Sequence, residues 1–255
     1  MRKTLFSGIA ACLLATAATA AEQSPSVIWT VGQADRSASE FALAPDRFRD
    51  FLANDFGYED KYFLVGHSVP AADFPYVLPG PADTWGGTWP TSGWRTHQVN
   101  ILFGLKEIPS DGTCTLVVDL LDYAKNFLPL VKVSVNTQDA KFQLDAPGLC
   151  VADQRKPNQM EKIVDTLSIT GNLAKATPRR LEIPIRPGVL KAGGNEVTIT
   201  VLEGSWILFD RVSLEGPAGT NVEQPQQLFI RNIEAAPYEL ADGKRRVQPL
   251  LVDLE

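Results

Sequence analysis

The chain has 255 residues, 44% hydrophobic and 21% charged, with 24 Lys and Arg against 30 Asp and Glu, which gives a formal net charge of −6. This acidic balance, together with the lack of any Lys/Arg cluster, excludes the electrostatic footprint of a nucleic-acid-binding protein. Two histidines and three cysteines without metal-ligand spacing argue against a zinc site. We expect no cofactor, with a structural calcium ion left open as the alternative.

The first twenty residues have the pattern of an export signal. Arg2 and Lys3 precede the apolar stretch "TLFSGIAACLLATA", and a small-x-small site ends at Ala20. Cleavage there removes two positive charges, so the net charge of −6 becomes −8. The alternative is a lipoprotein box, "IAAC", with Cys12 lipidated. No later segment is long and apolar enough to span a bilayer. We therefore expect a periplasmic or secreted protein, attached to a membrane only if Cys12 is lipidated.

Residues 25–217 are expected to form one all-β domain. Its first strand is "SVIWTVG" at 26–32. The one helical passage follows at 37–56, where Ser37 or Ser39 is suited to cap the helix and Pro45 is suited to a second start. This passage predicts a short helical insertion near the N-terminus.

Short runs with period-two alternation make up the rest of the domain, each ending at Gly, Pro, Ser or Asp. The predicted strands are 60–66, 96–105, 113–121, 130–137, 179–186, 195–203 and 205–216. Regular spacing without a βαβ rhythm favours two packed antiparallel sheets, that is, a jelly-roll (galactose-binding-like) sandwich. Residues 153–178 fit either a surface loop with a short helix or an irregular edge.

The last segment, 218–255, is expected to be an extension that forms a β-hairpin across "ADG". It is too short to fold alone. The pattern leaves two readings open, in which the segment either adds strands to the sandwich or opens a further domain.

Cys114 and Cys150 are the cysteines that remain after signal cleavage. In an oxidising compartment such a pair predicts one disulfide. It closes a loop of about 37 residues, which corresponds to about 4 kcal/mol of loop entropy. Two buried free thiols are the alternative.

A set of motifs resembles a known family. "IWTVGQADRSASEF", "PYVLPGPADTWGG", "VNILFGL", "TLVVDLLD", "VKVSVN" and "GSWILFDRVSLEGP" occur in this order over about residues 27–217. Together they resemble the C-terminal jelly-roll domain of rhamnogalacturonan lyases. The resemblance implies a carbohydrate-binding sandwich. In that family the lyase chemistry belongs to a separate, larger N-terminal domain with a Lys/His pair. Because only the expected signal peptide precedes residue 27 here, no catalytic residue is carried over.

Three of the five tryptophans lie in "PGPADTWGGTWPTSGW", residues 79–94. Trp85, Trp89 and Trp94 are therefore candidate carbohydrate-binding residues, because sugars stack their apolar faces on flat aromatic side chains mounted on loops. Tyr76 and His97 flank this stretch and extend the candidate site. The alternative is that one or two indoles plug the end of the sandwich, Trp85 first among them.

Further residues bear on the site and the core. Arg36 is a candidate ligand for an acidic sugar, because guanidinium groups bind carboxylates bidentately, with a turn residue as the alternative. Trp29 and Trp206 lie in apolar alternation and are expected in the core. Asp210 interrupts an apolar strand and needs a partner: a backbone turn, an Arg or calcium.

The sequence thus predicts an exported protein that binds a plant cell-wall polysaccharide by aromatic stacking and does no chemistry. One alternative is a lyase or hydrolase acting on pectin-type glycans. Another is an interaction module that adds strands to a partner such as a separate catalytic subunit. The negative charge argues against a strongly acidic glycan and favours a neutral side-chain sugar.

Overall fold

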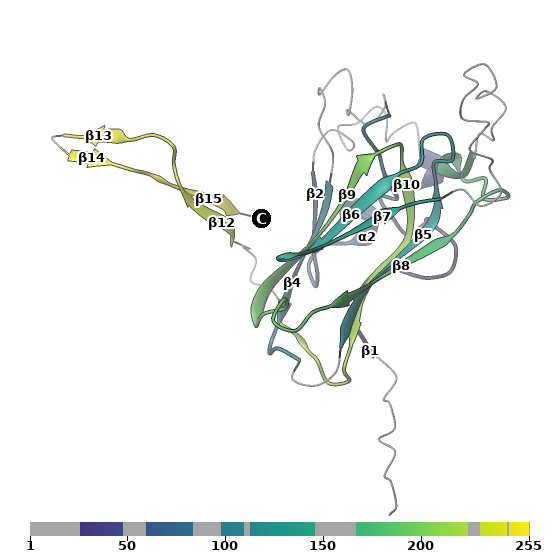
Figure 1. The fold of residues 1–255 in the computed structure, drawn as a ribbon, viewed down its shortest axis with the longest axis horizontal. Helices are drawn as coiled ribbons and strands as arrows, with labels where there is room; N and C mark the ends of the chain where they lie inside the picture. The colour runs from purple at the N-terminus through teal and green to yellow at the C-terminus, as the bar shows by residue number, and fades with distance from the viewer. Residues whose placement is uncertain are drawn as a thin grey trace, which may run out of the picture.

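The computed structural model describes residues 26–47, 60–83, 98–109, 113–145, 167–223, 230–243 and 245–254. Within these residues the chain is nearly all β, and two multistranded sheets pack face to face (Figure 1). The predicted fold class, a two-sheet sandwich, is confirmed.

The first sheet is antiparallel throughout and has the order β1-β10-β5-β8, with β3 also paired to β10. Its strands are β1 (Ser26–Gly32), β3 (Val77–Leu78), β5 (Cys114–Tyr123), β8 (Arg179–Ile185) and β10 (Ile207–Gly216).

The second sheet has the order β11-β4-β9-β6-β7, and β2 pairs with β4 in parallel. This one parallel pairing makes the sheet mixed. Its strands are β2 (Lys61–Leu64), β4 (Gln98–Leu105), β6 (Leu130–Val135), β7 (Gln138–Gln143), β9 (Gly193–Glu203) and β11 (Val222–Glu223).

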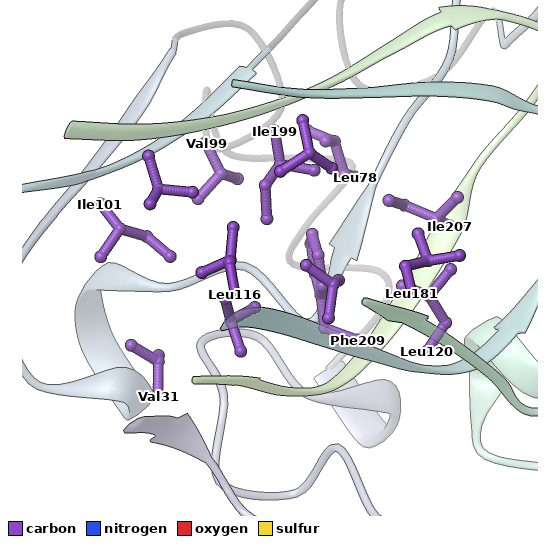
Figure 2. Packing of buried hydrophobic residues seen from close by; sticks show 14 of the residues in the cluster. Val31, Leu78, Val99, Ile101, Leu116, Leu120, Leu181, Ile199, Ile207 and Phe209 are labelled. Carbon is purple, nitrogen blue, oxygen red and sulfur yellow. The ribbon is translucent and has the colours of Figure 1, made fainter. Parts of the chain in front are cut away.

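The core lies between the two sheets. In β9, Val197, Ile199 and Val201 are fully buried, as the period-two alternation predicts. Figure 2 shows Val99, Ile101 and Ile199 of the second sheet pointing toward Leu116 and Phe209 of the first. Consecutive residues of β10, Ile207 to Phe209, are all buried, so this part of the strand is covered on both faces.

The helix predicted over 37–56 does not form in the described part of that range. Its one helical element there is the 3-10 turn η1 (Pro45–Arg47), at the predicted second start. Ser37 and Ser39 bond to each other through their hydroxyls at 2.8 Å. Leu43 has a left-handed φ of 52°, which interrupts a right-handed helix. Ala42 instead forms a parallel bridge with Pro75, and residues 48–56 lie outside the described residues.

Two further helical turns are α2 (Pro70–Asp73) and η5 (Leu167–Thr170). The second falls in the 153–178 stretch, for which a short helix or an irregular edge was expected.

Beyond the sandwich, two short antiparallel ladders form a ribbon, which Figure 1 shows in yellow beside the two layers. β12 (Ile230–Ala235) pairs with β15 (Leu250–Leu254), and β13 (Leu240–Asp242) pairs with β14 (Arg245–Val247). Among the described residues these four strands pair only with one another. We call residues 230–254 the C-terminal ribbon.

Cys114 is a buried free thiol, and burial raises its pKa. Its predicted disulfide partner, Cys150, lies outside the described residues. The disulfide between Cys114 and Cys150 therefore stays a prediction. The Tyr123 hydroxyl, at the far end of β5 from Cys114, donates to the backbone oxygen of Asp145.

Candidate functional site

One end of the sandwich collects most of the long connections, and we call it the loop end. β5 ends there at Tyr123, opposite Ile207, which begins β10. The second sheet reaches the same end where Leu130 of β6 pairs with Glu203 of β9, because the turn 204–206 joins β9 to β10. β4 also begins there, since Gln98 pairs with Thr200. Segment 84–97, which carries the tryptophans, therefore connects two points at the loop end.

Residues 79–83 of the "PGPAD" motif are anchored to the "GSW" motif of the β9–β10 turn. The Ser205 hydroxyl donates to Oδ1 of the buried Asp83, and the Gly80 amide donates to Oδ2 at 2.8 Å. The Ala82 amide donates to the Gly204 oxygen at 2.9 Å. A Cβ on Gly80 would lie 2.5 Å from that same oxygen, so only glycine permits this approach. Two motifs about 120 residues apart are thus one structural unit.

The carboxyl of Asp83 is 6% exposed. Burial raises its pKa to about 6, although the hydrogen bonds from Ser205 and Gly80 act in the opposite direction. A carboxyl in this position serves as an acceptor that holds two segments together. We assign it to anchoring rather than to chemistry, because its two oxygens accept hydrogen bonds from Ser205 and Gly80 of the two segments that it joins.

Segment 124–129 packs against the same turn. The Ser205 amide donates to Phe127 O at 2.9 Å, and the Ala124 amide donates to Trp206 O at 3.0 Å. Gly204 has a φ of 81°, and a Cβ on it would lie 2.3 Å from Leu128 O. Segments 79–83, 124–129 and 204–206 therefore form a fixed base at the loop end.

A buried ion pair supports this base from the side of β5. Lys125 donates through Nζ to Oδ1 of Asp122 and to Tyr123 O at 2.7 Å, and Nζ lies 3.7 Å from the centre of the Tyr123 ring. The Thr177 amide also donates to Asp122 Oδ1, at 2.9 Å. Burial lowers the pKa of Lys125, opposed by Asp122. Because such a pair is costly to break, it fixes segment 124–129 and the stretch before β8 to the end of β5.

The predicted ligand residues Trp85, Trp89, Trp94 and His97 all lie outside the described residues. The structure does place both ends of their segment. Asp83 is held by the base, and the backbone N–H of Gln98 donates to Oδ1 of Asp60 at 3.3 Å.

Tyr76 belongs to the core, which corrects its prediction as a ligand residue. Its side chain is fully buried, and its hydroxyl donates to Ile169 O at 2.8 Å. Desolvation raises its pKa far above the ordinary value. A ring in this position has no face to offer a sugar.

Arg36 is exposed and holds a left-handed φ of 64°. Its backbone amide donates to Oδ1 of Asp210 at 3.0 Å, and the Asp35 carboxylate accepts from the Ser37 amide at 2.9 Å. The turn is therefore the partner that Asp210 was expected to need. Burial raises the pKa of Asp210 to about 6, and the charges of Asp35 and Asp119 add to this effect.

Trp29 and Trp206 are buried, as predicted. Trp29 packs at 5.2 Å on Phe103, and Trp206 is 8% exposed at the start of β10. The sequence interpretation missed the buried polar residues Asp83, Asp122 and Lys125. Their motifs, "PAD" and "LLDYAK", are visible, but an exposed carboxylate and a buried one look alike in a sequence.

The described part of the chain contains neither a cluster of metal ligands nor a membrane-spanning helix. No group of three or more His, Cys, Asp or Glu side chains gathers there as a metal site. No helix there combines the length and the apolar character needed to cross a membrane.

Comparisons with known proteins identify one matching family model, described as "CBM-like: Polysaccharide lyase family 4, domain III", over residues 27–214. No curated protein matches the chain. Among solved structures, the chain is similar to a family GH115 4-O-methyl-α-glucuronidase "with specificity for decorated arabinogalactans", at 16% identity and a TM-score of 0.26. That match covers 47% of this chain and 13% of the other. At such a TM-score the likeness carries no argument.

Proposed function

Because the chain belongs to the CBM-like family described as domain III of polysaccharide lyase family 4, we propose that it binds plant cell-wall polysaccharide outside the cell without transforming it. The observation that carries this proposal is the family match over residues 27–214, which covers both sheets of the sandwich apart from β11 and the outer ends of β1 and β10. The ligand class that the relationship suggests is a glycan of the rhamnogalacturonan type.

The proposed contact surface is the tryptophan segment 84–97 at the loop end. Indole rings stack on the C–H faces of sugars, and they bind best when their mounting is rigid. The base of segments 79–83, 124–129 and 204–206 supplies such a mounting, because its backbone groups are hydrogen-bonded to one another. Trp89 and Trp94 are the proposed stacking residues. Trp85 follows Asp83 by two positions and is proposed to pack on the base.

The net charge of the protein narrows the range of glycans that it is expected to bind. A net charge of −6 opposes a polyuronate backbone at low ionic strength. Neutral side-chain sugars avoid this repulsion. We therefore propose neutral branches of the polysaccharide as the preferred ligand, with Arg36 as a peripheral contact to the occasional uronate.

Ligand retention on a glycan array, followed by calorimetric titration, tests the proposal with Trp89→Ala and Trp94→Ala. We expect each variant to lose about tenfold or more in affinity with an unchanged melting temperature. Trp206→Ala is the matched control, because removing that buried indole should lower the melting temperature instead of the affinity. Full affinity in both loop variants would contradict the proposed surface.

The non-catalytic part of the proposal needs a separate assay. Purified protein incubated with a panel of pectin-type glycans should produce neither unsaturated ends nor new reducing ends. Either product, abolished by a point substitution, would show an enzyme instead.

A further inference from the structure

The C-terminal ribbon exposes large apolar residues in a way that the sandwich does not. Among the described residues, the exposed large hydrophobics of the ribbon are Tyr238, Leu240, Val247, Leu250, Leu251 and Val252. Leu250 is 66% exposed and Val252 43% exposed, on one face of β15. Leu251, between them, is 36% exposed on the other face. Leu240 and Val247 are directly paired across β13 and β14, and both are exposed.

This arrangement is unstable for an isolated element. A two-stranded hairpin is marginal in water, and each apolar side chain left exposed forgoes burial energy. Strands β14 and β15 follow each other along one side of the ribbon. Among the described residues each of them pairs with one strand only, so their other side is an open edge. Such an edge is a template for another strand.

The edge is not blocked by its proline. Pro249 lies between β14 and β15, and its carbonyl accepts the Ala236 amide at 2.8 Å from within the ribbon. In an antiparallel ladder the N and O of one residue face the same neighbour. The position at which Pro249 has no N–H therefore points inward, and Leu250, the next residue, directs its backbone groups outward.

The sequence of this edge is complementary to itself. Residues 245–255 are "RRVQPLLVDLE", basic at the start and acidic at the end. Two copies meeting antiparallel about a two-fold axis through position 249 place Val247 opposite Leu251 and Arg245 opposite Asp253. Apolar residues then meet apolar ones, and opposite charges lie across from each other twice, once on each side of the axis.

We propose that the C-terminal ribbon is a homodimerisation element, in which the β14–β15 edges of two copies pair antiparallel into one four-stranded sheet. The partner is a second copy of this chain, because the self-complementary charge order fits an isologous contact. Dimerisation would present two sandwiches on one particle, so that weak carbohydrate contacts act together.

Light scattering after size exclusion and sedimentation equilibrium of the purified full chain test the proposal. We expect a dimer at micromolar concentration, and the double variant Val247→Asp/Leu251→Asp, which places two carboxylates opposite each other, should be a monomer with an unchanged sandwich melting temperature. Ile108→Asp is the matched control, because Ile108 is an apolar residue exposed to a similar degree, 52%, on the sandwich. It should remain a dimer.

A charge exchange tests the antiparallel register. Arg245→Asp should weaken dimerisation about tenfold by placing like charges opposite each other, and adding Asp253→Arg in the same chain should restore it. A wild-type chain that stays monomeric, a Val247→Asp/Leu251→Asp variant that stays dimeric, or an exchange that fails to restore pairing would each overturn the proposal. Monomeric wild type would mean that the ribbon pairs with a different protein.

Discussion

The sandwich and the C-terminal ribbon are built from the same kind of strand and differ in what covers it. In β9, Val197, Ile199 and Val201 are fully buried, whereas in β15 Leu250 and Val252 are largely exposed. Both strands are antiparallel and rich in aliphatic residues. A facing sheet buries the first set, and no second layer of described residues covers the second.

The difference teaches that alternation identifies strands but not their burial. A sheet face gains stability only when another layer excludes water from it. The sandwich contains its own second layer, so its stability belongs to the monomer. The ribbon does not, so its stability depends on a contact made elsewhere.

The largest effect should come from removing an aromatic ring that joins the two layers. Phe74 packs on Phe41, Phe63 and Phe209 at centroid distances of 5.3, 5.8 and 5.1 Å. Phe74→Ala should lower the free energy of unfolding by about 3–5 kcal/mol, because the cavity cannot refill. Leu250→Ala in the ribbon should change the unfolding of the sandwich by less than about 0.5 kcal/mol. Urea titration of both variants measures the contrast, and equal losses would remove it.

The next-largest loss of stability is expected when one of two glycines, Gly204 or Gly243, is replaced by alanine. Gly204 and Gly243 both have positive φ, but a Cβ on Gly204 would meet Leu128 O at 2.3 Å, while nothing lies within 4 Å of one on Gly243. Gly204→Ala should cost about 3 kcal/mol or more, from strain and steric overlap together. Gly243→Ala strains only the turn of the C-terminal ribbon, so the stability of the sandwich should change by less than about 0.5 kcal/mol. Thermal melts compare the two, and similar costs would show that the base at the loop end is not tightly packed.

The smallest effect concerns pH. Because burial raises the pKa of Asp83 from 3.8 to about 6 in the folded protein, the folded state binds more protons than the unfolded state between about pH 4 and 6. Stability from this group is therefore lost as pH rises through that window. The free energy of unfolding of Asp83→Asn, taken relative to wild type at the same pH, should therefore increase as pH rises from 4 to 7. The total increase should be less than about 3 kcal/mol.

The control for this pH effect is Glu239→Gln in the ribbon, since the exposed pair that Glu239 forms with Arg246 contributes at most about 1 kcal/mol. Chemical denaturation at four or five pH values provides the measurement. A pH-independent difference between Asp83→Asn and wild type would show that Asp83 is not buried as a carboxyl in solution.

The strands were predictable because each is a local pattern. Period-two alternation in "NEVTITV" gave both the strand and its buried face correctly. The passage from 37 was not predictable in the same way. Ala38, Phe41 and Ala42 have helical spacing, but they reach the core from an irregular turn held by the bridge from Ala42 to Pro75.

The candidate site was predictable only as a location along the chain. Tyr76 was assigned to a ligand surface because it lies near the tryptophans, yet its hydroxyl is bound by Ile169, which is 93 residues away. Asp83 and Ser205 are 122 residues apart, and nothing local to either indicates that they meet.

The amino-acid order by itself determined the period-two strands, their all-β class and the family motifs, because these depend on neighbouring residues and backbone preference. The tertiary structure alone decided which polar side chains are buried, which turn Arg36 and Asp210 share, and which aliphatic strands find a second layer. These features depend on contacts between distant segments, whose free energy exists only once both sheets have assembled around a common interior.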